Sequence, residues 1–119
     1  MPDAGLMMYG IRNCDTIKKA RAWLDQHAIH YQFHDYKKHG IDHDQLQRWV
    51  SELGWEQLIN KRGTSWRKLD QQQQSVMDDS LAVKVMMQNP SIIRRPLLVV
   101  GEQKILGFNE KTYAQELLS

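Results

Sequence analysis

Cys14 is the residue whose type and position are best suited to chemistry in this sequence. It is the only cysteine of the 119-residue chain, and it stands between an apolar run and a helical pattern. At a helix amino terminus, free backbone N–H groups and the macrodipole favour the thiolate and lower the pKa of a cysteine. Arg12 adds positive charge nearby. We therefore predict that Cys14 is a nucleophilic thiolate that attacks disulfides, peroxides or oxyanions.

The alternative is that Cys14 is an inert, small apolar residue, as buried free cysteines often are. Its neighbours Arg12, Asn13, Asp15 and Thr16 are polar, which favours the reactive interpretation. In that interpretation Asn13 or Thr16 hydrogen-bonds to the thiolate, and Arg12 helps to hold an anionic partner.

Other kinds of cysteine or metal site are excluded by residue type and spacing. Ile17 stands where a Cys-x-x-Cys motif needs its second cysteine, so this motif cannot support a dithiol mechanism. A phosphatase loop needs an arginine at the position of Ala20. Five histidines fall between residues 27 and 43, but their spacing matches no metal-ligand pattern. We therefore expect no metal site and no bound cofactor.

Arg95 and Pro96 form a second candidate, directly before the apolar run of residues 97–100. An arginine there can hold a carboxylate or another oxyanion bidentately, and a cis proline would occupy a tight turn. The residues alone favour the alternative, in which Arg94 and Arg95 are solvated and the proline is trans.

The elements that must position Cys14 follow from hydrophobic periodicity. Residues 6–9 are apolar and predict a buried strand, which Gly10 ends. A helix follows and ends near His27; its apolar positions recur every three or four residues. Apolar residues then alternate with polar ones over residues 29–33, which predicts a second strand. A β-α-β crossover makes the two strands parallel. The helix positions are Ile17, Ala20, Trp23 and Leu24.

The rest of the chain predicts a helical block and then a hairpin with a final helix. We expect Asp42 to cap one helix, and Asp79 or Ser80 to cap another that ends before Pro90. Residues 97–100 and 104–106 predict antiparallel strands around a turn at residues 101–103. A helix capped by Asn109 follows. Its inward residues are predicted to be Tyr113, Leu117 and Leu118. The sheet is therefore expected to be mixed.

Bulk composition is that of an ordinary globular protein. Hydrophobic residues make up 41% and charged residues 25% of a chain whose length suits one compact domain. The net charge of +2 is too small to indicate nucleic acid or a membrane as a partner. A single cysteine, no predicted signal peptide and no membrane span favour a cytoplasmic protein. We expect a monomer.

Four motifs, in the same order, resemble those of the ArsC/Spx family, the arsenate reductase-like proteins, with the YffB-like proteins as the nearest subgroup. The resemblance covers nearly the whole chain. The motifs are Tyr9-Gly10-Ile11-x-x-Cys14-Asp15-Thr16, Lys61-Arg62-Gly63-Thr64-x-x-Arg67-x-Leu69, Asn89-Pro90-x-x-Ile93-x-Arg95-Pro96 and Gly107-Phe108.

The resemblance implies an α/β fold like that of thioredoxin. A mixed four-stranded sheet (β-α-β … β-β-α) would form one domain over residues 1–119, with a helical subdomain inserted at about residues 41–89. Cys14 matches the family's nucleophile, and Arg95 matches the arginine before its cis proline, here Pro96. In arsenate reductases of this type the cysteine attacks arsenate, glutathione resolves the adduct, and glutaredoxin completes the cycle. YffB-like proteins have been proposed to be glutathione-dependent thiol reductases.

The sequence also departs from the family pattern. Arsenate reductases carry an arginine where Asn60 aligns, and another near Gly107-Phe108, where none stands here. Each lost charged hydrogen bond weakens anion binding by about 1.5–3 kcal/mol, so arsenate is a poor fit as substrate. Arg62 is a candidate substitute, although Lys61, Arg62, Arg67 and Lys68 are more simply explained as a solvated basic surface. Ile17 removes the Cys-x-x-Cys switch that is usual in Spx regulators.

Three functions follow, and the leading one is a monothiol reductase with Cys14 as nucleophile and glutathione as co-substrate. Glutaredoxin or a protein disulfide would be its further partner. Arg12, Arg62, Arg95 and Pro96 would belong to its binding site. The alternatives are an arsenate reductase linked to glutathione and glutaredoxin, and a non-enzymatic, Spx-like protein-interaction module.

Overall fold

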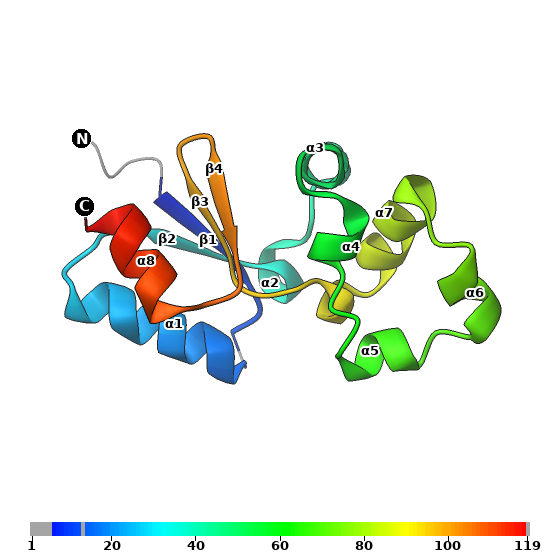
Figure 1. Cartoon of the computed structure of the whole chain (residues 1–119), viewed down its shortest axis with the longest axis horizontal. Coiled ribbons are helices and arrows are strands. Elements are labelled where there is room, and N and C mark those ends of the chain that lie inside the picture. The colour runs from blue at the N-terminus through cyan, green and yellow to red at the C-terminus, as the bar shows by residue number, and fades with distance from the viewer. Residues whose placement is uncertain (1–5, 13, 119) are drawn as a thin grey trace. The chain divides into compact units, whose positions relative to one another are not determined.

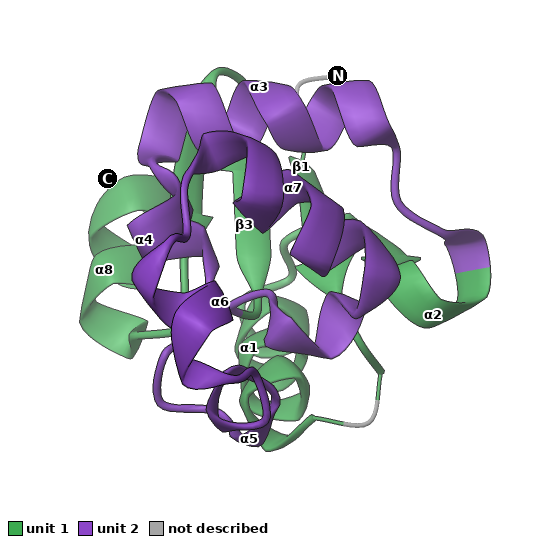
Figure 2. Ribbon diagram, turned by 90° about the vertical axis from the view of Figure 1, so that its right-hand side faces the viewer, with its two compact units in different colours: residues 1–38, 95–119 green, residues 39–94 purple. Residues whose placement is uncertain are grey.

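The chain forms two compact units in the computed structural model, which describes residues 6–12 and 14–118. Unit 1 comprises residues 1–38 and 95–119, and unit 2 comprises residues 39–94 (Figure 2). The segment expected as a helical insertion, residues 41–89, falls within unit 2. Asn13 lies outside the described residues.

Unit 1 contains a mixed four-stranded sheet in the order β2-β1-β3-β4, which confirms the predicted thioredoxin-like α/β fold (Figure 1). β1 (Leu6–Gly10) runs parallel to β2 (Gln32–Asp35) and antiparallel to β3 (Leu97–Val100). β4 (Gln103–Leu106) returns beside β3. The parallel pair brings the carboxyl ends of β1 and β2 together, where Gly10 pairs with Asp35.

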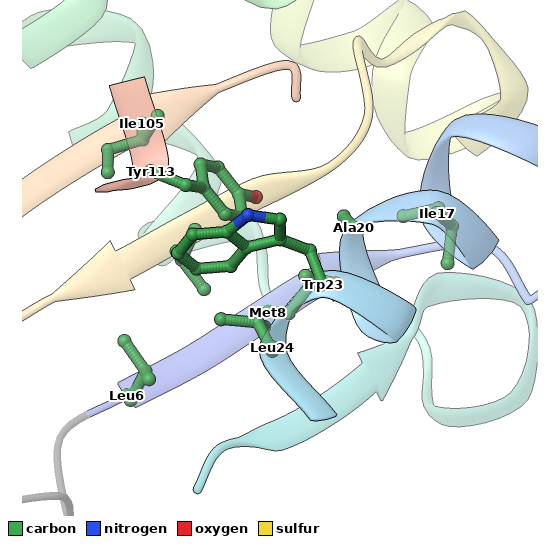
Figure 3. Packing of buried hydrophobic residues seen from close by; sticks show 9 residues of the cluster. Leu6, Met8, Ile17, Ala20, Trp23, Leu24, Ile105 and Tyr113 are labelled. Carbon is green, nitrogen blue, oxygen red and sulfur yellow. The ribbon is translucent and has the colours of Figure 1, made fainter. Parts of the chain in front are cut away.

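Two helices pack on one face of this sheet and bury its core. Trp23 of α1 (Asp15–Gln26) meets Tyr113 of α8 (Glu110–Leu117) edge to face, with ring centroids 5.5 Å apart (Figure 3). The sheet contributes alternate residues to the same cluster, as the pleat requires. Those residues are Leu6, Met8, Leu98 and Ile105.

Three predictions for unit 1 are wrong in detail. β2 begins at Gln32, because its parallel register starts opposite Met7. Ile29 and Tyr31 still pack against the core. The alternation of apolar and polar residues in this segment therefore indicated which side chains are buried, but it did not indicate strand pairing. Gln103 belongs to β4, since it pairs with Val100 across a two-residue turn. Leu118 follows the last residue of α8 and is 50% exposed, because the helical face defined by Tyr113 and Leu117 does not include it.

One short helix, α2 (Tyr36–His39), directly follows β2 and was not predicted. Asp35 explains its position, because its carboxylate accepts a hydrogen bond from the N–H of Lys37 at 2.9 Å. Such a contact from a carboxylate to the N–H two residues ahead satisfies a donor in the first turn of the helix.

Unit 2 is helical, as predicted. Asp42 occupies the N-cap position of its longest helix, although its side chain makes no capping hydrogen bond. The cap of a later helix is Asp78 rather than Asp79 or Ser80, because its carboxylate accepts from the N–H of Leu81 at 2.9 Å. The helices are α3 (His43–Leu53), α4 (Trp55–Leu58), α5 (Thr64–Arg67), α6 (Gln71–Ser75) and α7 (Asp79–Gln88), followed by the 3-10 helix η2 (Pro90–Ile92).

Backbone hydrogen bonds join the segment after α4 to the last residues of unit 2. The N–H of Asn60 donates to Ile92 at 2.9 Å, and the N–H of Arg94 donates to Leu58 at 2.7 Å. Ile59 and Ile93 form an antiparallel bridge between them.

Over residues 6–12 and 14–118, no helix has both the length and the apolar character needed to cross a bilayer.

Gly10 allows the end of β1 to approach the first turn of α1 closely. A Cβ at this position would overlap Cδ1 of Ile17 and lie 3.2 Å from its Cγ1. Ile17 is fully buried, so it has little room to move. We predict that Gly10→Ala lowers the free energy of unfolding by about 1–3 kcal/mol, as overpacked cores do.

Chemical denaturation of Gly10→Ala, Ile17→Val and the double variant measures this effect. Ile17→Val removes Cδ1, so Gly10→Ala should cost less in that background. An equal cost in both backgrounds would contradict the steric explanation.

Candidate active site at the start of α1

Cys14 is the N-cap residue of α1. Its backbone is extended, with φ −145° and ψ 128°, and its carbonyl accepts the first helical hydrogen bond from Lys18 at 3.0 Å. The side chain is half-buried and packs against the core of unit 1. The sulfur therefore lies where the free N–H groups of the first helical turn converge.

The surroundings of Cys14 lower the pKa of its thiol. Partial burial raises the pKa, but this effect is outweighed by hydrogen bonding from the Ile17 N–H, by a hydrogen bond and positive charge from Arg95, and by the Thr16 N–H. Each donor favours the charged form, because a thiolate accepts hydrogen bonds more strongly than a thiol.

Arg95 reaches the sulfur from the segment that precedes β3. The Arg95–Pro96 peptide bond is cis, which confirms the expectation from the family resemblance. The carbonyl of Pro96 accepts a hydrogen bond from the N–H of Gly107 at 2.8 Å, so the Gly107-Phe108 motif anchors this segment. A Cβ on Gly10 would lie 3.9 Å from Cβ of Arg95, which places the end of β1 beside the arginine.

Asp35 is a residue of this region that the sequence reasoning missed. It is 7% exposed, and its carboxylate accepts from the N–H of Arg12 at 3.3 Å as well as from Lys37. Burial raises the pKa of Asp35. Hydrogen bonds from Lys37, Arg12 and Lys38 and the charge of Arg12 lower that pKa by more than burial raises it, so the carboxyl stays ionised. The signal in the sequence was an acidic residue at the carboxyl end of a parallel strand.

The predicted site residues are only partly brought together. Cys14 and Arg95 form one cluster in unit 1, Pro96 follows Arg95 through the cis bond, and Thr16 joins the cluster through its backbone N–H. The side chain of Arg12 is exposed, and its charge acts on Asp35. Arg62 belongs to unit 2, where its N–H donates to Oδ1 of Asn60 at 3.1 Å.

This arrangement combines a stabilised thiolate with a guanidinium. A half-buried sulfur of lowered pKa can attack an electrophilic sulfur or an oxyanion. An arginine beside it can bind a carboxylate or oxygen anion in the same place. The cluster therefore suits a nucleophilic step on an anionic partner.

Comparison with known proteins shows that most of the chain matches one protein family. Residues 9–115 match the model of the ArsC family. The solved structure of a YffB protein is 46% identical, with a TM-score of 0.89 over 94% of this chain and 98% of that one. An arsenate reductase (ArsC) related protein from Brucella melitensis is 43% identical, with a TM-score of 0.80 over 93% and 92% of the two chains.

A curated relative is named global transcriptional regulator Spx, from Streptococcus mutans. It is 32% identical over 82% of this chain and 72% of its own length. The span matched by the family model, residues 9–115, includes both Cys14 and the helical unit. The chain belongs to the ArsC family.

Proposed function

We propose that the protein is a thiol oxidoreductase in which Cys14 is the nucleophile and glutathione is the co-substrate. The observation that carries this proposal is the convergence of Arg95 and the first-turn amides on the sulfur, which lowers the pKa of the Cys14 thiol. A thiolate present at neutral pH is the form that exchanges with disulfides.

The reaction has two exchange steps. The Cys14 thiolate attacks the glutathione sulfur of a mixed disulfide, RS–SG, which forms Cys14–S–S–G and releases RS⁻. The thiolate of a second glutathione then attacks the glutathione sulfur of that adduct, which releases glutathione disulfide and restores the Cys14 thiolate. The incoming glutathione thiol is oxidised to the disulfide level, which the glutathionyl group of RS–SG already has. The substrate sulfur is reduced to RSH, and it takes up the proton that the glutathione thiol loses.

Glutathione is proposed as the co-substrate because the chain has no second cysteine to resolve the adduct. Glutathione also carries carboxylates, and Arg95 offers a fork of N–H donors beside the sulfur. A protein disulfide or glutaredoxin would be the further partner in turnover.

Incubation of the reduced protein with glutathione disulfide, followed by intact mass and peptide mapping, tests the proposal. One glutathione adduct at Cys14, removed by excess reduced glutathione, is the expected result. An unmodified protein under conditions that alkylate Cys14 would reject glutathione as the co-substrate.

Arsenate reduction is a second candidate, favoured by the 43% identical structure described as arsenate reductase related. The Asn60 position and the region near Gly107-Phe108 lack the arginines of arsenate reductases. Loss of two charged hydrogen bonds, each worth about 1.5–3 kcal/mol, would weaken arsenate binding by a few orders of magnitude. We predict slow turnover in an assay coupled to glutathione and glutaredoxin. Turnover comparable to thiol reduction would make arsenate the preferred substrate.

A further inference from the structure

Asp35 is the only charged side chain that the structure buries among the described residues. A buried carboxylate needs hydrogen-bond donors to offset its desolvation. Asp35 receives them from two segments that are far apart in the sequence. Its Oδ1 accepts from the N–H of Lys37 at 2.9 Å, and its Oδ2 accepts from the N–H of Arg12 at 3.3 Å.

The bond to Arg12 leads directly to the nucleophile. The carbonyl of Arg12 accepts a hydrogen bond from the N–H of Cys14 at 3.0 Å. Asp35 therefore connects to the Cys14 backbone through two successive hydrogen bonds. Residues 11, 12 and 14 lie outside the helices and strands, so these bonds help to fix the position of the N-cap residue.

We propose that Asp35 is a positioning residue for Cys14: by holding the backbone N–H of Arg12, its carboxylate fixes the loop that presents the sulfur to Arg95 and to the first turn of α1. This inference deepens the proposed function and rests on it, since positioning matters to a reaction only if Cys14 reacts. In this role Asp35 acts on the sulfur through the backbone of Arg12 and Cys14.

Asp35→Asn is the variant that isolates this role. An asparagine has one side-chain oxygen, whereas N–H donors on two separate segments need an acceptor. The oxygen should keep the shorter, local contact with Lys37, and the amide NH₂ would then face the N–H of Arg12. The variant therefore keeps the start of α2 and loses the link to the Cys14 loop.

The direction of the effect separates positioning from charge. A carboxylate near a thiolate repels it, so removing the charge alone would lower the Cys14 pKa and make the thiol more reactive at low pH. Loss of positioning does the opposite, because Arg95 and the amides no longer converge on the sulfur. A purely structural role would lower the melting temperature and leave the pKa of Cys14 unchanged.

The experiment measures the rate of Cys14 alkylation by iodoacetamide as a function of pH. Asp35→Asn should raise the midpoint, and at a fixed pH below both midpoints the rate should fall about threefold per pH unit of that rise. The thiolate fraction falls tenfold per unit, and the higher nucleophilicity of a more basic thiolate recovers about threefold. Asp25→Asn removes an equal charge from the exposed side of α1 and should leave the midpoint in place. An unchanged or lowered midpoint in Asp35→Asn would overturn the proposal.

A second comparison asks whether the backbone or the guanidinium of Arg12 transmits the effect. Arg12→Ala keeps the N–H that Asp35 holds, so the shift caused by Asp35→Asn should persist in the Arg12→Ala background. Disappearance of the shift there would show that Asp35 acts through the charge of Arg12, and the positioning proposal would be wrong.

Hydrogen exchange of the wild-type protein provides a measurement that needs no variant. The Arg12 amide should be protected from exchange to a degree similar to the Lys37 amide; exchange at the rate of an open loop would contradict the proposal. Neither alkylation nor hydrogen exchange involves glutathione. A failed glutathione adduct would therefore reject the co-substrate without deciding the role of Asp35.

Discussion

Cys14→Ser will form no glutathione adduct and will reduce disulfides only at the uncatalysed rate. A serine hydroxyl at this position is not ionised at neutral pH, and the chain has no other thiol that can take over. The loss should therefore be complete, in contrast to enzymes in which a second group rescues the reaction. Intact mass after treatment with glutathione disulfide, together with a coupled reductase assay, measures both effects.

The variant also controls for folding. Serine is among the residues preferred at a helix N-cap, so Cys14→Ser should keep α1 and melt at a temperature no lower than the wild type. Residual reductase activity in a folded Cys14→Ser protein would show that Cys14 is not the nucleophile.

An unchanged set of bound proteins in the variant, with no reductase activity in either the wild type or the variant, would favour the interaction-module function.

Arg95→Met will move the midpoint of Cys14 alkylation to higher pH. The variant removes both a hydrogen bond to the sulfur and a nearby positive charge, and both favour the thiolate. At a pH below both midpoints, we expect alkylation to slow by about threefold for each unit of the shift. Glutathione adduct formation should fall by more than alkylation, because iodoacetamide carries no charge for Arg95 to bind and glutathione does.

Two matched variants separate these causes. Arg94→Met removes the neighbouring, exposed arginine and should change neither rate. Arg95→Lys keeps the charge and loses the planar fork. Its alkylation midpoint should therefore lie between those of the wild type and Arg95→Met, and its rate of glutathione adduct formation should stay close to that of Arg95→Met. If Arg95→Met leaves the midpoint where it was, Arg95 does not stabilise the thiolate.

Residue patterns in the sequence were enough to predict the sheet and the place of Cys14 in it, because both follow from local signals. The apolar run of β1 and the helical spacing of α1 place Cys14 at a strand-to-helix junction without any knowledge of long-range contacts. The mixed sheet follows from one crossover and one hairpin. Strand boundaries were less accurate, since pairing depends on a partner strand; β2 begins where Met7 lies opposite Gln32.

The rest of the site could not be predicted from residue patterns because it depends on contacts between distant segments. The residues alone favoured a solvated Arg95 and a trans Pro96, and only the family resemblance pointed to the cis bond that the structure contains. Asp35 carries no motif, and its role depends on the register that brings it beside Gly10 and the Arg12 loop. Thr16 contributes its backbone N–H, which every residue type except proline possesses.

The pH dependence of Cys14 alkylation in the wild-type protein tests the central claim most directly. A rate profile with iodoacetamide yields the pKa of the single thiol, with the Cys14→Ser protein as the blank. The structure predicts a midpoint below the value of about 8.5 for an unperturbed cysteine, because the donors around the sulfur outweigh its partial burial. A midpoint at or above that value would show that Arg95 and the start of α1 do not stabilise a thiolate, and would contradict the account of the site.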